Sequence, residues 1–250
     1  ELQGVLARCT WPHIHVSDSL LMADSAITMA EAGVTSVVVL GVDFMSENVR
    51  AMLDAAGHKE VPVYRVTAPP IGCSLAESAE TAAYGAYLSE ASQYERALHI
   101  VYINTSLVTK AKAHALVPTL TCTSSNVVRS VLQAAAQVPD INIFFGPDTY
   151  MGHNLAHLFA SLGQMDAAKV AAVHPAHTPE SVRALAERFH YFEQGTCIVH
   201  HMFGAEVVAQ VEQSSPDAFV TAHLEVPGEM FALGLERQRR GAGVVGSTSD

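Results

Sequence analysis

Two pairs of polar residues have a spacing that suits chemistry at a shared surface. Tyr102 and Asn104 are separated by one residue, and so are His223 and Glu225. In an extended strand the side chains of residues i and i+2 lie on one face. Tyr and Asn suit hydrogen bonding and orientation of a substrate, whereas a carboxylate beside an imidazole suits proton transfer. The alternative is that both pairs lie at strand edges that face water.

Two solitary cysteines are a second set of candidates. Cys73 and Cys197 each lie close after a glycine, and neither has a second cysteine nearby for a disulfide or a zinc pair. Thiolates are the usual ligands of iron-sulfur clusters. If three symmetric domains each supplied one thiolate, a [4Fe-4S] cluster would keep one iron free to bind substrate as a Lewis acid. The alternatives are two packed cysteines, or half of a zinc site at Cys197 with His200 and His201, although no matching second pair occurs.

Hydroxyl side chains recur where helices are expected to begin. Ser19, Ser124, Ser247 and Thr248 are residues of this kind. Most hydroxyl residues at such positions only cap the first backbone N–H groups of the helix. If several of them met at one centre, their hydroxyls and the helix N-termini would bind a phosphate or a carboxylate.

The candidates recur at nearly constant intervals, which predicts an internal repeat. Cys73 and Cys197 are 124 residues apart, and Tyr102 and His223 are 121 residues apart. A shorter match precedes them around Ser19, so we expect three pseudo-threefold-related α/β/α domains, the first lacking its start and the third its end. The predicted domains are residues 1–92, 93–180 and 181–250.

The elements that must position these residues are short apolar runs rich in β-branched residues, which alternate with helical patterns. This alternation indicates parallel strands buried on both faces. The expected strands are 36–40, 98–103, 119–122, 141–145, 218–224 and 243–245. The expected helices are 20–31, 44–55, 126–137, 179–188, 205–213 and 228–240. The expected joins between units are 75–92 and 173–180. The polar candidates fall at the carboxyl ends of the strands, where active sites of open α/β sheets lie.

The composition argues against several classes of protein. The chain has 250 residues, of which 49% are hydrophobic, so it can bury a large core. Its net charge of −11 repels phosphate backbones and anionic lipid surfaces, which argues against nucleic-acid and membrane partners. No uninterrupted apolar run reaches the roughly 18 residues that a membrane span needs. Four scattered cysteines indicate a reducing compartment rather than a disulfide framework.

Seven motifs follow one another in a fixed order. They are Gly41-Val42-Asp43-Phe44-Met45, Tyr102-x-Asn104-x-Ser106, Cys122-Thr123-Ser124-Ser125-Asn126, Phe145-Gly146-Pro147-Asp148, Cys197-x-Val199-His200, His223-x-Glu225 and Gly246-Ser247-Thr248. Together they resemble quinolinate synthase, and the resemblance runs through nearly the whole chain. Segments 11–19 and 223–230 are most similar to the plant and algal form, which is plastidial and carries an additional sulfur-transfer domain before this region.

The resemblance implies three α/β domains around a [4Fe-4S] cluster. It also implies condensation of iminoaspartate with dihydroxyacetone phosphate to quinolinate, phosphate and water, in NAD biosynthesis. By position, Cys73 and Cys197 match two cluster ligands, and the catalytic residues would be His223, Glu225 and Tyr102. The residues that match substrate-binding positions are Ser19, Tyr102, Asn104, Ser124, His223, Glu225, Ser247 and Thr248.

Two parts of the family pattern are expected outside this chain. The third cluster cysteine is expected beyond residue 250 and an early His-x-Tyr motif before residue 1, so the fragment alone is expected to be inactive. The expected protein partners are a sulfur-transfer or iron-sulfur assembly system and an iminoaspartate-producing enzyme, and the expected location is the plastid stroma. The alternatives are a metal-free module that binds a phosphate ligand and an inactive paralogue.

Overall fold

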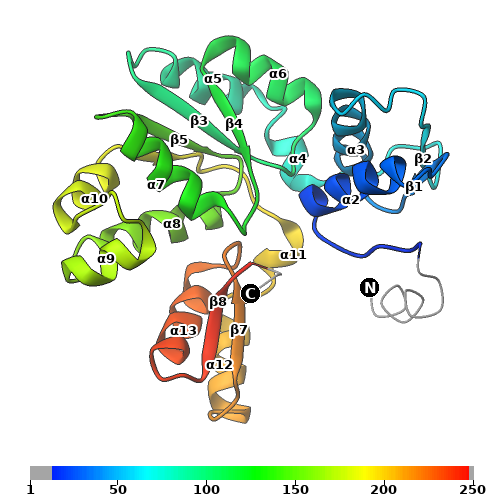
Figure 1. Cartoon of the computed structure of the whole chain (residues 1–250). Helices are drawn as coiled ribbons and strands as arrows, with labels where there is room; N and C mark the ends of the chain where they lie inside the picture. Colours follow the sequence, from blue (N-terminus) through cyan, green and yellow to red (C-terminus); the bar gives the residue numbers. More distant parts are fainter. Residues whose placement is uncertain (1–12, 248–250) are drawn as a thin grey trace. The chain divides into compact units, whose positions relative to one another are not determined.

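The computed structural model describes residues 13–247, and these divide into two compact units at the peptide bond between Cys73 and Ser74. Figure 1 shows the elements of each unit. The first unit contains α2 (Ser19–Glu31), β1 (Val37–Val39), α3 (Asp43–Ala55) and β2 (Val63–Arg65). None of the helices that the structure describes is long and apolar enough to cross a membrane.

The first unit is a parallel pair of strands packed with two helices. β1 and β2 are in register, with Val37 opposite Val63. Asp18 caps the start of α2, because its Oδ1 accepts hydrogen bonds from the backbone N–H groups of Leu20 and Leu21, at 2.9 and 3.0 Å. Gly33 follows the end of α2 with φ of 92°, a left-handed conformation that glycine adopts without strain. The core residues are Ala23, Ala26, Ala30, Val39, Val49, Leu53 and Val61.

The second unit is built on a four-stranded parallel sheet. Its strands are β3 (Ala97–Tyr102), β4 (Thr119–Cys122), β5 (Asn142–Gly146) and β6 (Phe189–Tyr191), in the order β4-β3-β5-β6. All neighbouring pairs are parallel, so the carboxyl ends of the strands meet at one edge of the sheet.

Helices connect and cover these strands, as expected for parallel crossovers. They are α4 (Ser74–Ser78), α5 (Ala82–Ala91), α6 (Leu107–Leu116), α7 (Val127–Gln137), α8 (Thr149–Leu162), α9 (Ala167–Val173) and α10 (Pro179–Ala186). One apolar cluster against the sheet contains Tyr84, Leu88, Ala91, Ala113, Val117, Phe144 and Phe192.

The same unit ends in a second, two-stranded sheet. After α11 (Ile198–His201) and α12 (Ala205–Ser214), β7 (Val220–His223) pairs in parallel with β8 (Gly243–Gly246), and α13 (Gly228–Arg239) connects them. The register places His223 opposite Gly246, so the end of β7 lies beside the end of β8. Figure 1 shows α12 and α13 beside this strand pair.

The predicted α/β class with parallel sheets is confirmed, and each expected strand and helix is present within a few residues of its predicted bounds. The three-domain division stays a prediction. Several elements were not predicted: the three-residue strands β2 and β6, and the helices α4 to α6, α8, α9 and α11. Residues 75–92, predicted as a join, hold most of α4 and all of α5.

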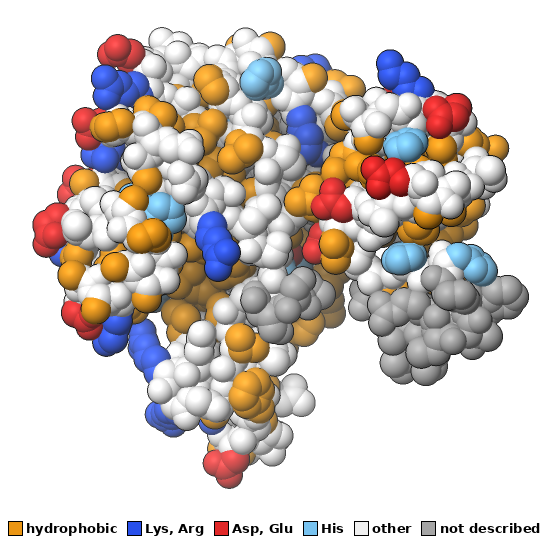
Figure 2. Space-filling view, viewed as in Figure 1, with side chains coloured by type: hydrophobic (Ala, Val, Ile, Leu, Met, Phe, Trp, Pro, Cys, Tyr) orange, Lys and Arg blue, Asp and Glu red, His pale blue; other side chains and the backbone are white. Residues whose placement is uncertain are grey.

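Figure 2 shows how side-chain types are distributed on one face. Lys and Arg side chains are interspersed with Asp and Glu side chains there, among many polar and apolar ones.

Candidate functional site

The carboxyl ends of β3, β4 and β7 bring residues from distant parts of the second unit together. Nε2 of His223, the last residue of β7, lies 3.1 Å from the Oγ of Ser124, which follows β4. Both side chains are half-buried. This contact joins the end of the four-stranded sheet to the end of the two-stranded sheet, so two predicted site residues 99 positions apart are neighbours.

Glu225 is the buried acid of this site, with only 3% of its surface exposed. Its Oε2 lies 3.3 Å from Nδ1 of His223, as the spacing of the pair predicted, and its backbone N–H donates to the same Nδ1. Burial raises the pKa of Glu225 to about 7, and the nearby Asp148 carboxylate adds to the rise. A carboxyl group with this pKa exchanges its proton near neutral pH.

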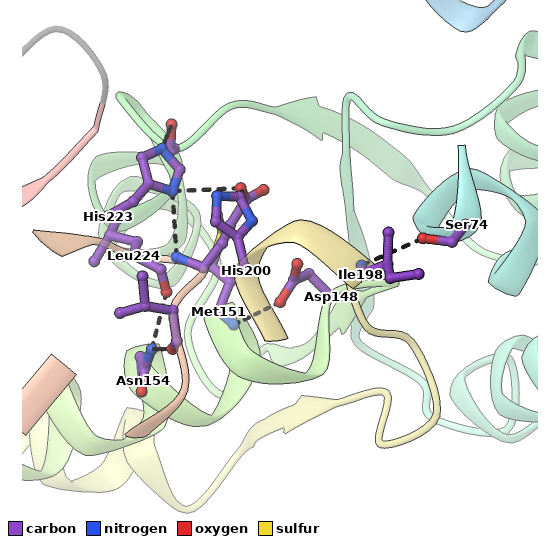
Figure 3. A network of polar contacts seen from close by, with 11 residues as sticks. Ser74, Asp148, Met151, Asn154, Ile198, His200, His223 and Leu224 are labelled. Carbon is purple, nitrogen blue, oxygen red and sulfur yellow. Dashed lines mark hydrogen bonds and ion pairs between the residues drawn. The ribbon is translucent and has the colours of Figure 1, made fainter. Parts of the chain in front are cut away.

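His200 is a third member of the cluster. Its Nδ1 lies 3.0 Å from Oε2 of Glu225, although the geometry is not that of a hydrogen bond. Its ring stacks on that of His223 with centroids 5.3 Å apart and planes 2° apart. Figure 3 shows the two imidazoles together. Sequence reasoning considered His200 as half of a zinc site and as part of a motif; the missing signal was its contact with Glu225, which is 25 residues away.

The three side chains could hold a metal ion. One ligand atom from each of His200, His223 and Glu225 lies within 4.8 Å of the others. The same contacts also arise in a site that moves protons between a carboxylate and imidazoles. Among the residues that the structure describes, no thiol belongs to this group.

Tyr102 supplies a buried phenol to the same site. It is the last residue of β3, and its hydroxyl interacts with the Glu225 carboxylate and the Ser124 hydroxyl. Burial raises the pKa of Tyr102 well above its usual value, and Glu225 adds to the rise. The phenol therefore stays protonated and can donate a hydrogen bond to a carboxylate or to a bound ligand.

Asn104 lies in the loop that follows β3. Its side chain is half-buried, and Lys110 of α6 fixes the backbone on both sides of it. Nζ of Lys110 donates to the carbonyl oxygen of Ile103 at 3.0 Å and also to that of Thr105. The ammonium group of Lys110 therefore helps to fix the backbone before and after Asn104.

Asp148 is a functional candidate that sequence reasoning missed. It is fully buried and begins α8, where its Oδ1 accepts from the backbone N–H of Met151 at 2.7 Å. Its Oδ2 has no hydrogen-bond donor among the described residues, and burial raises its pKa to about 7, with Cys197 adding to the rise. The signal in the sequence was an acidic residue between a buried strand and a helix, which also describes an ordinary helix cap.

Cys197 lies beside this acid, at the start of α11, and is half-buried. Its loop is fixed two residues earlier, because the N–H of Gly195 donates to Oγ1 of Thr149 at 2.9 Å and the N–H of Thr149 donates to the Gly195 oxygen at 2.7 Å. A Cβ at position 195 would overlap the carbonyl oxygen of Pro147, so only glycine fits there.

The other two described cysteines differ from each other. Cys73 is half-buried, at the end of the first unit, and is not in a disulfide. Cys122 is fully buried, and burial raises the pKa of its thiol far above the usual value. A thiol that stays protonated is a poor metal ligand.

A comparison with protein families shows which family this chain belongs to. The family model described as "Quinolinate synthetase A protein" matches residues 12–249. The chain belongs to this family. The resemblance seen in the motifs is therefore confirmed.

Individual relatives agree with the family match. The chain is 59% identical to "Quinolinate synthase, chloroplastic" of Nicotiana tabacum and 58% identical to the protein of that name from Arabidopsis thaliana, in each case over 100% of this chain and 35% of the relative. It is 29% identical to "Quinolinate synthase" of Methanopyrus kandleri, over 93% of this chain and 65% of that protein. The chain thus spans about a third of the length of the plant relatives it matches.

The structure brings part of the predicted quinolinate synthase site together. Tyr102, Ser124, His223 and Glu225 form one cluster, and Asn104 follows Tyr102 by two residues. Ser19 is the buried first residue of α2 and belongs to the first unit, as Cys73 does. Ser247 is half-buried directly after β8, and Thr248 lies outside the described residues.

Proposed function

We propose that this chain carries the active site of a quinolinate synthase, which condenses iminoaspartate with dihydroxyacetone phosphate and releases phosphate and water. The observation that carries the proposal is the buried contact of Glu225 with His223 and Tyr102, at the ends of parallel strands in a chain of this family.

The condensation needs groups that accept and return protons near neutral pH. Glu225 has the raised pKa that this task requires, and His223 can relay a proton because its other ring nitrogen contacts Ser124. Oε1 of Glu225 and Oδ2 of Asp148 are buried and have no hydrogen-bond donor among the described side chains. A buried acceptor without a donor is costly, so both atoms suit a ligand that brings hydroxyl or imine hydrogens.

The hydroxyl residues are proposed to bind the carboxylates and the phosphate of the two substrates. Ser124 is held by His223, and Tyr102 stays protonated, so both can donate to an anion. Ser19, Asn104, Ser247 and Thr248 are proposed members of the same substrate site. Tyr102 and Asn104 would orient iminoaspartate, while Glu225 and His223 move its protons.

Cys73 and Cys197 are proposed as two of the thiolate ligands of a [4Fe-4S] cluster. Both are half-buried and outside disulfides, which fits this donor type, whereas the protonated, fully buried thiol of Cys122 does not. When bound, such a cluster supplies a Lewis-acidic iron that polarises a substrate oxygen. Gly195 and Thr149 fix the loop that would present the Cys197 thiol.

A location and protein partners are also proposed. The plant relatives are named as chloroplastic, so we propose that the protein acts in the plastid stroma. There it would receive iminoaspartate from the enzyme that makes it, and its cluster from a sulfur-transfer and iron-sulfur assembly system.

The proposal is tested with the full-length parent protein, reconstituted anaerobically and supplied with iminoaspartate and dihydroxyacetone phosphate. We expect quinolinate to form only when iron and sulfide were provided. Cys197→Ser should abolish both iron retention and turnover, whereas Cys122→Ser should retain iron. No product from a protein with an intact cluster would contradict the proposed reaction and favour a changed substrate or an inactive paralogue.

A further inference from the structure

The loop that carries Glu225 receives two hydrogen bonds from one side-chain amide of a distant helix, in addition to the backbone bonds of Leu224 to Gly246 and of Val226 to His223. Asn154, in the second turn of α8, is fully buried. Its Nδ2 donates to the carbonyl oxygen of Leu224 at 2.9 Å and to that of Val226 at 2.8 Å. Figure 3 shows the Asn154 amide reaching this loop. The two acceptors are the carbonyl groups of the residues before and after Glu225.

These two hydrogen bonds anchor the backbone on both sides of Glu225 and so restrict the direction in which its side chain leaves the backbone. The peptide plane before Cα of Glu225 is bound directly, through the carbonyl oxygen of Leu224. The plane after it lies between this bonded carbonyl and the bonded carbonyl of Val226, one residue further on, so its rotation is restricted from both sides. An asparagine amide has two N–H donors, and both are used for this purpose. Alanine, leucine or an ionised aspartate at position 154 would supply no donor at all.

A restraint is needed at this place because Glu225 is a costly residue to bury. An ionised carboxylate is more stable in water than in a protein interior, so a free loop would let it turn outward. The loop follows a short strand, and the N-cap of the next helix, Pro227, makes no side-chain capping bond. The groups that face Glu225 are Tyr102, Asp148, His200 and His223, and Asp148 repels it when both are ionised.

We propose that Asn154 is a positioning residue for the reaction, holding Glu225 against His223 and Tyr102 through the two carbonyl groups that flank it. This inference rests on the proposed function, since it assigns the residue that places the proton-transfer carboxylate. Asn154 itself does not touch the reacting atoms.

The first test is a double-mutant cycle in the full-length parent protein. Asn154→Ala should lower kcat by about 10- to 100-fold, since small misplacement of a catalytic group has effects of this size. In a Glu225→Gln background the same substitution should lower kcat by less than about threefold, because residues that act through one another are not additive. An equal loss in both backgrounds would overturn the proposal.

The second test needs no turnover and separates this inference from the proposed reaction. Infrared titration of the parent protein, with the Glu225→Gln spectrum subtracted, reports the ionisation of the Glu225 carboxyl. Without the two hydrogen bonds from Asn154, the Glu225 carboxyl becomes more hydrated. The midpoint of its titration in Asn154→Ala should therefore move down by about one pH unit. An unchanged midpoint would overturn the proposal, whether or not the wild-type protein makes quinolinate.

Two further variants keep these tests interpretable. Val182→Ala removes a buried side chain of α10, which packs against α8, and leaves a cavity there. It should lower stability without moving the titration midpoint of Glu225. If Asn154→Ala does not fold, Asn154→Ser keeps one donor and should shift the midpoint in the same direction by a smaller amount. A shift of equal size in Val182→Ala would show a general packing effect and would overturn the assignment.

Discussion

Two loops at the site are each restrained by one side-chain nitrogen that bonds to two backbone carbonyls, but the two nitrogens come from different distances along the chain. After β3, Nζ of Lys110 bonds to the carbonyls on both sides of Asn104, and after β7, Nδ2 of Asn154 bonds to those on both sides of Glu225. Lys110 lies five to seven residues from its acceptors, whereas Asn154 lies 70 and 72 residues from its own. The first loop is fixed within one strand-to-helix connection, and the second only when two sheets have come together.

The difference also concerns charge. A lysine donates charge-assisted hydrogen bonds, which are stronger than those of a neutral amide. The neutral donor serves the loop that carries the carboxylate, where a cation would hold the pKa of Glu225 down. The amide thus restrains Glu225 and leaves its raised pKa intact.

The largest expected effect comes from removing the side chain that each loop presents. Glu225→Gln should lower kcat of the full-length parent by about 10²- to 10⁴-fold, the usual range for a general acid or base. Asn104→Ala removes only an orienting group and should act mainly on KM. Glu229→Gln, an exposed site on α13, is the matched control. Steady-state kinetics measure all three, and an active Glu225→Gln variant would exclude the carboxylate from proton transfer.

The next effect is on stability at the first loop. Lys110→Met leaves the carbonyls of Ile103 and Thr105 without their shared donor, so we expect a loss of about 3 kcal/mol in the free energy of unfolding. Lys112→Met makes the same change at an exposed position of α6 and should cost little. Urea unfolding of the parent protein compares them; equal midpoints would show that the lysine does not restrain the loop.

A pH effect should distinguish the second loop from the first. Glu225 binds its proton more tightly in the folded chain, so this stabilisation is full below about pH 4.5 and is lost as the pH rises through about 7. The raised pKa of Asp148 lowers the free energy of unfolding over the same pH range. We expect the unfolding free energy to fall by on the order of 2 kcal/mol per group between pH 4.5 and 7.5.

Variants assign that slope to its source. Glu225→Gln should remove about half of the decrease, because Asp148 still titrates, whereas Lys110→Met should lower the free energy of unfolding without changing its slope with pH. Urea midpoints across the pH range measure both. A wild-type slope in Glu225→Gln would assign the whole effect to Asp148 and contradict the raised pKa of Glu225.

The smallest effect concerns the helix that supplies the first restraint. Ser106 caps α6 by accepting from the N–H of Thr109 at 3.2 Å, and Ser106→Ala should cost about 1 kcal/mol. Since Lys110 is in the first turn of that helix, hydrogen exchange at Ile103 and Thr105 should accelerate slightly. Unchanged exchange at these amides would show that the lysine holds the loop without help from the cap.

The sequence predicted those parts of the structure that depend on neighbouring residues. The bounds of β4 and the adjacency of His223 and Glu225 follow from spacing and local hydrogen bonding. The repeat and the parallel-sheet pattern also predicted that Ser124 would share a centre with them. Such patterns report on residues that are close in the sequence. Only the resemblance to a family led from these residues to a particular reaction.

The parts that were missed depend on contacts across the fold. His200 was read as a zinc ligand candidate, Asp148 only as a motif residue, and Asn154 was not noticed. Nothing in the local sequence of α8 shows that its amide reaches a loop 70 residues ahead. Helix α5 was missed because its alanine-rich pattern lacks a clear apolar stripe.

A short tether, residues 195–197, connects the Cys197 thiol to Gly195, whose backbone is bonded to Thr149. Two residues extend at most about 7 Å, so whatever surrounds it, the sulfur explores only a small volume around the start of α8. Random variation at Thr196, which is exposed, should therefore be tolerated, whereas one inserted residue between 195 and 197 should not. The length of this tether, more than its composition, is what selection would preserve.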